Sequence, residues 1–149
     1  MHTEFQTIRE LVEFSLHEGP QTKGMYTFGR VSQELSNIIL GVIGKSVYQY
    51  RVTIDNSAIR HIVRQHGGNT ERLRGQVPVE TSDFLALEGC ILTPQQVHDG
   101  GQKVGQPASV NFVVFTASLS ITIVLDIHPG KRRRYLAVKT MYKRKGQPQ

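Results

Sequence analysis

One stretch decides the fold, Thr53-Ile-Asp-Asn-Ser-Ala-Ile-Arg-His-Ile-Val-Arg-Gln-His-Gly-Gly68, and it predicts a short helix that carries two histidines. Its first polar residues, Asp55, Asn56 and Ser57, are candidate N-caps, because their side-chain oxygens accept hydrogen bonds from the free amides of a first helical turn. Gly67 is expected just past the last turn, because glycine tolerates the left-handed conformation that ends many helices. Both ends of the helix are therefore marked in the sequence.

This helix is expected to be amphipathic. Residues at the i, i+3, i+4, i+7 spacing of a buried stripe are Ile59, Ile62, Val63 and His66. The opposite face is basic and polar and holds Ser57, Arg60, His61, Arg64 and Gln65. The two histidines are separated by about 140° around the helix axis. They are expected to point in different directions.

Each histidine has a structural and a catalytic interpretation. His66 suits a half-buried position near the helix C-terminus, where it would bond a late carbonyl and interact with the negative end of the dipole. His61 lies on the polar face, where the structural alternative is a solvated surface histidine. Both are also candidates for acid–base catalysis, because imidazole titrates near neutrality. A zinc site is not expected, since helical zinc pairs have i, i+4 spacing and the chain has one cysteine.

The length of 149 residues suits one domain with a core that needs no disulfide, and a single cysteine excludes an intramolecular bridge. No apolar run is long enough to span a bilayer, and the N-terminus does not resemble a secretory leader. We therefore expect a soluble chain with no membrane partner. It would be cytoplasmic, or delivered into the cytoplasm of a target cell as part of a larger effector.

The formal net charge of +6 is concentrated near the C-terminus. Residues 131–149 hold eight lysines and arginines and no acid, which leaves ten basic and twelve acidic residues before them. A localised cationic surface attracts polyphosphates through counterion release, so nucleic acid is the favoured partner class. The alternatives are an anionic membrane surface and a solubilising tail. The basic residues alternate with a strand pattern, which favours a surface patch over a tail.

The remaining elements are predicted from periodicity and from glycine and proline positions. Helices are expected at 7–17, 32–42 and 81–89, strands at 45–55, 110–115, 119–127 and 133–142, a polar connector at 21–30, and loops at 69–76 and 98–107. The two strands after residue 110 are expected to form a hairpin. In the last strand the alternation does not decide which face covers the core, so Lys139 and Thr140 cannot both be assigned to one cleft.

Two motifs carry a resemblance to a known family. They are Ile-Arg-His-Ile-Val-Arg-Gln-His-Gly at 59–67 and Arg-Arg-Arg-Tyr-Leu-Ala-Val-Lys-Thr-Met-Tyr-Lys at 132–143. Together they resemble the phage- and mobile-element-associated nucleases of the Barnase/EndoU/colicin/RelE-like (BECR) group. The resemblance implies an α+β fold in which N-terminal helices pack on a small antiparallel sheet of about four strands. It also suggests a helical extension or linker at 1–28, a nuclease domain at 29–145 and a disordered tail at 146–149.

By the same resemblance, the chain would be a metal-independent ribonuclease of the toxin or effector type that needs no cofactor. RNA, with tRNA as one candidate, would be its substrate, and a cognate immunity or antitoxin protein a second partner. The residues implied as catalytic are His61, His66, Lys139 and Thr140. Those assigned to nucleic-acid binding are Arg64, Arg132, Arg133, Arg134, Tyr142 and Lys143.

These groups suffice for RNA cleavage, because the 2′-hydroxyl of RNA attacks the adjacent phosphorus and leaves a 2′,3′-cyclic phosphate. Histidines would serve as base and acid, and cationic or hydroxyl groups would stabilise the phosphoryl oxygens. The competing hypothesis is a non-catalytic RNA- or protein-binding module of a phage or mobile element, with structural histidines. A dinucleotide-binding domain is disfavoured, since no glycine-rich strand-to-helix fingerprint is present.

Overall fold

The computed structural model describes residues 3–68, 76–116 and 118–145, and these form a mixed α+β fold around one sheet. Within these residues the sheet has eight strands in the order β1-β2-β3-β8-β7-β6-β5, and β4 pairs with β8 outside this path. The expectation of about four strands was therefore wrong. The expectations for residues 69–75 and 146–149 lie outside the described residues.

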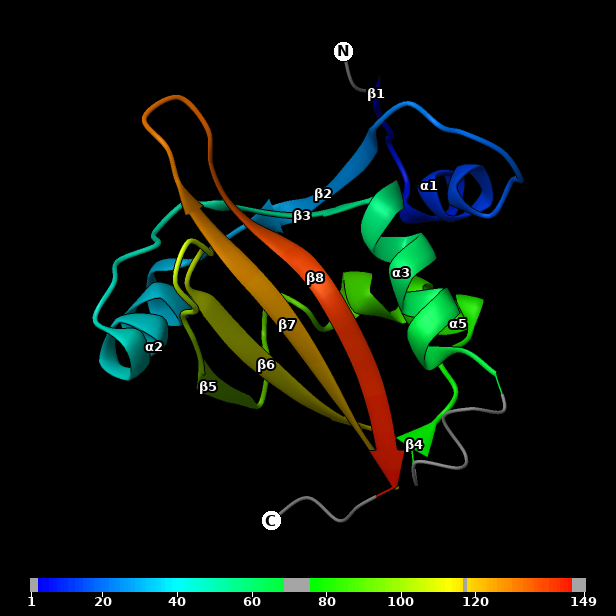
Figure 1. Cartoon of the computed structure of the whole chain (residues 1–149). Coiled ribbons are helices and arrows are strands. Elements are labelled where there is room, and N and C mark those ends of the chain that lie inside the picture. Colours follow the sequence, from blue (N-terminus) through cyan, green and yellow to red (C-terminus); the bar gives the residue numbers. More distant parts are fainter. Residues whose placement is uncertain (1–2, 69–75, 117, 146–149) are drawn as a thin grey trace.

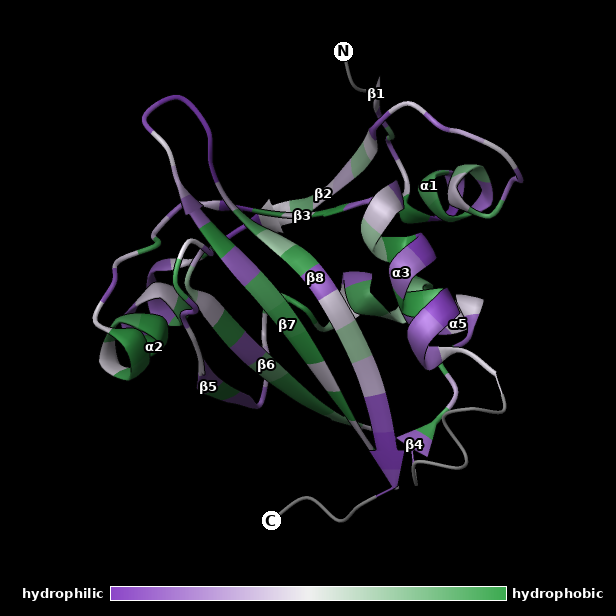
Figure 2. Cartoon of the chain, in the orientation of Figure 1, coloured by the Kyte–Doolittle hydropathy of each residue, from purple (hydrophilic) through white to green (hydrophobic). Residues whose placement is uncertain are grey.

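The strands are β1 (Thr3–Glu4), β2 (Gly24–Arg30), β3 (Arg51–Asp55), β4 (Gln76–Val77), β5 (Gln96–Gly101), β6 (Ser109–Thr116), β7 (Leu119–Pro129) and β8 (Arg134–Lys145). The helices are α1 (Ile8–Ser15), α2 (Gln33–Ile43), α3 (Asn56–His66), α5 (Thr81–Ala86) and the 3-10 turn η1 (Leu87–Gly89). The predicted hairpin of β6 and β7 is confirmed, and β8 continues it as a third antiparallel strand. Figure 2 shows polar and apolar residues alternating along β7 and β8, the pattern of a sheet with one buried face.

Three segments differ from their predictions. The expected connector at 21–30 contains β2, which lies between β1 and β3 in the sheet. The expected loop at 98–107 begins as part of β5, which pairs with β6. The predicted strand at 45–55 is regular only as β3, and it pairs with β8 in parallel. The predicted domain boundary between residues 28 and 29 falls within β2.

The helices lie in two places (Figure 1). α1, α3 and α5 gather beside β8, where α3 packs on the strand and α1 packs on both α3 and α5. α2 lies away from them and contacts β5. Within α2, Leu35 and Ile39 are buried, whereas Ile38 and Val42 are 45% and 37% exposed.

The core joins the inner face of β6, β7 and β8 to the apolar stripe of α3. Ile123, Leu125 and Leu136 are fully buried in the sheet, and Ile59 and Ile62 are fully buried on the helix. Burying an aliphatic side chain of this size stabilises a fold by about 1.5–3 kcal/mol. The stripe therefore fixes the rotation of α3 about its axis and decides where its two histidines point.

Candidate active site

The start of α3 is fixed by two polar side chains with different roles. Asp55 is the N-cap and accepts a hydrogen bond from the Ala58 amide at 2.8 Å. Asn56 is buried; its amide oxygen accepts from the Gly24 amide at 3.0 Å, and its amide nitrogen donates to the Thr22 carbonyl at 3.1 Å. The first turn of the helix is thereby tied to β2.

The end of α3 differs from the prediction. Gly67 has extended backbone (φ −103°, ψ 136°), and the positive φ of 99° falls at Gly68. Glycine is needed at 67 for space, since a Cβ there would lie 2.7 Å from the Val63 carbonyl oxygen. The His66 carbonyl accepts from the Val79 amide at 2.8 Å, which anchors the last turn to the segment before α5.

The two histidines meet despite their angular separation. The ring centroids of His61 and His66 are 6.5 Å apart in an edge-to-face arrangement. The centroid of the His66 ring also lies 5.9 Å from that of Tyr142 on β8. The Arg144 guanidinium lies over the ring of Tyr142, 5.1 Å from its centroid. Residues from both predicted motifs are thus brought together beside β8. We call His61, His66, Lys139 and Tyr142 the histidine cluster.

A β-bulge brings Lys139 to this place. In the β7–β8 register Val124 pairs with Thr140 and Leu125 pairs with Val138, so Lys139 has no opposite residue. The extra residue shifts the alternation by one. Leu136 and Val138 are buried before the bulge, and Met141 is buried after it. This resolves the ambiguous alternation of the last strand.

His61 and Lys139 line one surface hollow, which we call the histidine hollow. Its other polar lining includes Asp55, Ser57, Asp126 and His128. Partial burial lowers the pKa of His61, and the neighbouring His66, Arg64 and Lys139 lower it further. The imidazole of His61 is therefore biased toward its neutral form, which can accept a proton.

Thr140 follows the bulge, but its hydroxyl is shielded. The Oγ1 atom is buried and has no hydrogen-bond partner among the described residues. A buried hydroxyl without a partner is destabilising, so this atom is a weak point of the packing or a group that needs a ligand. In this conformation it does not face solvent as its predicted catalytic role would require.

Lys143 does not join the predicted nucleic-acid surface. Its ammonium lies 2.8 Å from the Asp83 carboxylate, and the two side chains are 8% and 15% exposed. The charge is neutralised inside the fold and cannot reach a phosphate. Arg64, in contrast, is exposed on α3.

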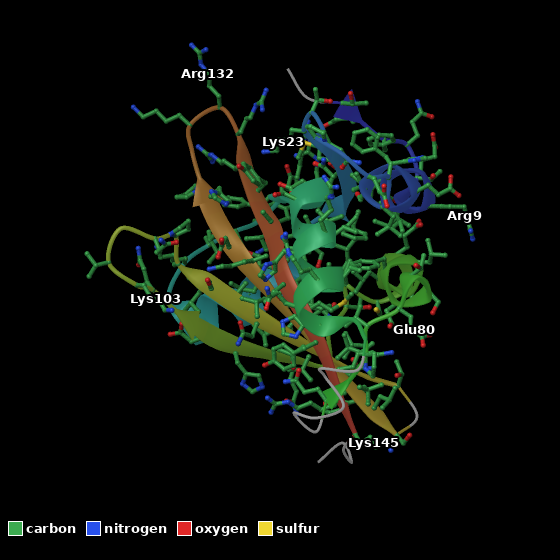
Figure 3. The ribbon with its side chains drawn as sticks, turned by 45° about the vertical axis from the view of Figure 1, so that its right-hand side comes forward. Arg9, Lys23, Glu80, Lys103, Arg132 and Lys145 are labelled. Atoms are coloured by element: carbon green, nitrogen blue, oxygen red, sulfur yellow. The ribbon has the colours of Figure 1, made fainter. Side chains whose placement is uncertain are left out.

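The three arginines at 132–134 lie at the other end of β8. Figure 3 shows Arg132 at the tip of the β7–β8 loop and Lys145 at the opposite end of the strand. The basic residues predicted as one patch are therefore divided by the length of β8. Arg132, Arg133 and Arg134 line a second depression, the arginine hollow, together with Lys131, Arg30 and Arg51.

The sequence did not single out several of these lining residues. Arg30 and Arg51 belong to β2 and β3, and Asp126 and His128 to β7. Tyr135 lines both hollows and stacks on His128, with ring centroids 4.5 Å apart. The sequence gives only a weak indication of these lining residues, because a polar residue of a site cannot be told from any other polar residue on the solvent side of a strand until the neighbouring strands are known.

The described part of the chain contains neither a metal-binding cluster nor a membrane-spanning helix. No group of three or more histidine, cysteine, aspartate and glutamate side chains there could hold a metal ion. No helix among those residues is long and apolar enough to cross a membrane.

A comparison against protein families identifies the family of the chain. The family described as phage-Barnase-EndoU-ColicinE5/D-RelE like nuclease 3 matches residues 29–148. This span includes α3, the hairpin of β6 and β7, and the residues of β8 that line the two hollows. The comparisons with curated proteins and with solved structures found no match. The family implies a nuclease and therefore a nucleic-acid substrate. With a match over most of its length, the chain belongs to the phage-Barnase-EndoU-ColicinE5/D-RelE like nuclease 3 family.

Proposed function

We propose that the protein is a metal-independent endoribonuclease that cleaves RNA by transesterification and acts as a toxin or effector. The observation that carries this proposal is the position of His61, whose ring centroid lies 6.5 Å from that of His66 and which lines one hollow with Lys139. Burial and these cationic or titratable neighbours lower the pKa of His61. An acid, a base and a cation within reach of one phosphodiester are what this reaction requires.

The reaction uses the nucleophile of the substrate. The 2′-oxygen attacks the adjacent phosphorus, a bond from phosphorus to O2′ forms, and the bond from phosphorus to O5′ breaks. The products are a 2′,3′-cyclic phosphate and a 5′-hydroxyl. One proton leaves the 2′-hydroxyl and another reaches the departing 5′-oxygen, so the protein supplies one base and one acid.

His61 suits the base, because its lowered pKa favours the neutral imidazole at neutral pH. His66 suits the acid, since its ring lies 6.5 Å from that of His61 and is flanked by Tyr142. Each role is worth about 10²- to 10⁴-fold in rate. Lys139, at the β-bulge of β8, stabilises the extra negative charge on the phosphoryl oxygens.

The direct test is cleavage of RNA in the presence of a chelator. We expect an oligoribonucleotide to yield products with a 2′,3′-cyclic phosphate in excess EDTA, and an analogue with a 2′-deoxy group at the cleaved position to stay intact. His61→Ala should lower the rate by about 10²-fold or more. His17→Ala is the matched control, because His17 is exposed and lies just after α1, outside the cluster.

Two outcomes would overturn the proposal. One is cleavage that requires a divalent metal or that also cuts the 2′-deoxy analogue. The other is a folded His61→Ala and His66→Gln double variant that still cleaves RNA at the parent rate. In the toxin role, we expect a cognate immunity or antitoxin protein to inhibit by covering the histidine cluster.

A further inference from the structure

The arginine hollow is built from segments that are distant in the sequence. Among the described residues seven basic side chains line it, and they come from the segment before β2, from β2, from β3, and from the β7–β8 loop with the start of β8: Lys23, Arg30, Arg51, Lys131, Arg132, Arg133 and Arg134. One carboxylate, Glu4 of β1, also lines it and pairs with Arg51 at 3.5 Å. The fold therefore gathers positive charge here beyond the C-terminal run that the sequence displays.

Two tyrosines stand on a turn at the rim of this hollow. Tyr48 is 46% exposed, and Tyr50 is half-buried. Between them Gln49 has a positive φ of 65°, a conformation that side-chain-bearing residues rarely adopt. The turn is held because the Gln49 amide donates to the Val31 carbonyl and the Val31 amide donates to the Tyr50 carbonyl, both at 2.9 Å. The aromatic rings are thus presented from a fixed backbone.

Arginine is held in the same turn. The Arg30 guanidinium donates to the Gln49 carbonyl at 3.1 Å. Cationic groups beside exposed aromatic rings are the elements that bind single-stranded nucleic acid, since the cations contact phosphates and the rings stack with unpaired bases. A merely solubilising loop would need neither the tyrosines nor the fixed turn.

The arginine hollow adjoins the histidine hollow. Lys23, Met25, Thr53 and Tyr135 line both. Along β8, Arg134 and Lys139 are separated by about 16 Å at about 3.3 Å per residue. A strand with stacked bases, at the 3.4 Å axial spacing of a duplex strand, covers that distance with about five nucleotides, and a more extended single strand covers it with fewer.

We propose that the arginine hollow is a second subsite for the same RNA, which binds an unpaired segment up to about five nucleotides from the cleaved phosphodiester. This inference rests on the proposed function, and it adds the substrate class: single-stranded RNA or a loop that is long enough to span both hollows. Arg51 and the arginines of the β7–β8 loop bind phosphates there, and Tyr48 stacks with a base.

Binding can be tested apart from cleavage with a fluorescent 2′-O-methyl decanucleotide, which lacks the attacking hydroxyl. By fluorescence anisotropy, we expect Arg51→Gln and Tyr48→Ala each to weaken affinity at least several-fold, and the triple change of Arg132, Arg133 and Arg134 to glutamine to weaken it at least tenfold. The salt dependence should also become shallower, because fewer counterions are released. A fully paired duplex should compete poorly.

Two control variants sharpen this test. Glu4→Gln should tighten binding, because it removes the carboxylate that competes for Arg51. Arg9→Gln should leave the affinity unchanged, because Arg9 projects from α1 on another side of the molecule (Figure 3). The opposite signs expected for Glu4→Gln and Arg51→Gln exclude a general loss of folding as the explanation.

Cleavage gives a second readout. A dinucleoside phosphate is too short to reach the arginine hollow, so Arg51→Gln should lower the ratio of kcat/KM for a decanucleotide to that for the dinucleoside at least several-fold. If no RNA is cleaved at all, the proposed function fails while the anisotropy experiment still tests the subsite. Unchanged decanucleotide affinity in Arg51→Gln, Tyr48→Ala and the triple variant would overturn the subsite and leave the hollow to a protein partner.

Discussion

The ammonium of Lys143 lies 2.8 Å from a carboxylate oxygen of Asp83, and this ion pair joins β8 to α5. Asp83 also acts locally, because the same oxygen accepts a hydrogen bond from the Glu80 amide at 2.7 Å in a capping box. With side-chain exposures of 8% and 15%, the pair is nearly removed from water. The ion pair holds Lys143, the neighbour of Tyr142 on β8, in place against α5.

Breaking this pair should be costly. Lys143→Met is expected to lower the free energy of unfolding by about 3 kcal/mol or more, because it leaves the Asp83 carboxylate buried without its partner. The double change with Asp83→Asn should cost less than the sum of the single changes. Urea denaturation measures both. A loss below about 1 kcal/mol for Lys143→Met would show that the carboxylate finds water or another partner.

The glycine that ends α3 gives a second stability prediction. Gly67→Ala should destabilise the protein by about 1–3 kcal/mol, since the new Cβ would meet the Val63 carbonyl oxygen at 2.7 Å and force the helix end to move. Gly41→Ala is the matched control, because no atom of the described residues lies within 4 Å of a Cβ built there and Gly41 is inside α2. In that helix, alanine should stabilise by about 0.5–1 kcal/mol. Equal effects at the two positions in thermal unfolding would contradict the steric argument.

How much of this was predictable depends on the range of the interactions. The α3 helix and the β6–β7 hairpin follow from local caps and alternation, and both are present as predicted. The parallel pairing of β3 with β8 joins segments about eighty residues apart, and no local pattern encodes it. Strands of two residues such as β1 and β4 are too short to show any period.

The residues of the candidate site also differ in how far the sequence alone could predict them. The histidines and Lys139 could be named from motifs, but their meeting depends on the bulge, whose only trace in the sequence is the step from Val138 to Met141. No local pattern indicates that Lys143 pairs with Asp83, sixty positions earlier, so the charge of Lys143 was wrongly assigned to the surface. Arg30 and Arg51 were missed because an isolated arginine in a strand carries no information about what the fold places beside it.

The shielded hydroxyl of Thr140 yields a prediction that separates stability from activity. Thr140→Val keeps the shape and removes a buried oxygen that has no hydrogen-bond partner among the described residues. We expect an increase in unfolding free energy of about 1 kcal/mol, the order of the penalty for an unsatisfied polar group. If the hydroxyl turns to bond the phosphate during the reaction, RNA cleavage should nevertheless fall. A variant that is both less stable and fully active would contradict this account.

The last prediction concerns His61 and its pKa. His61→Ala removes a half-buried polar ring and no core contact, so it should change stability by less than about 1 kcal/mol while RNA cleavage falls about 10²-fold or more. In the parent protein the acidic limb of kcat/KM reports the base of the free protein. Because burial and the cationic neighbours lower the pKa of His61, this limb should lie below the ordinary histidine value of 6.5.

The same shift has a consequence for folding that requires no substrate. The unfolded chain protonates His61 near its ordinary value of about 6.5, whereas the folded chain does so only at lower pH. Between those values the unfolded state binds more protons, so the parent protein should lose stability as the pH falls below about 6.5. His61→Ala should flatten this decline and should match the parent near pH 8, where the imidazole is neutral in both states. Urea titrations at pH 8 and pH 5 measure the difference, and a steeper decline in His61→Ala would mean that the folded protein favours the charged ring and that His61 is unsuited to act as the base.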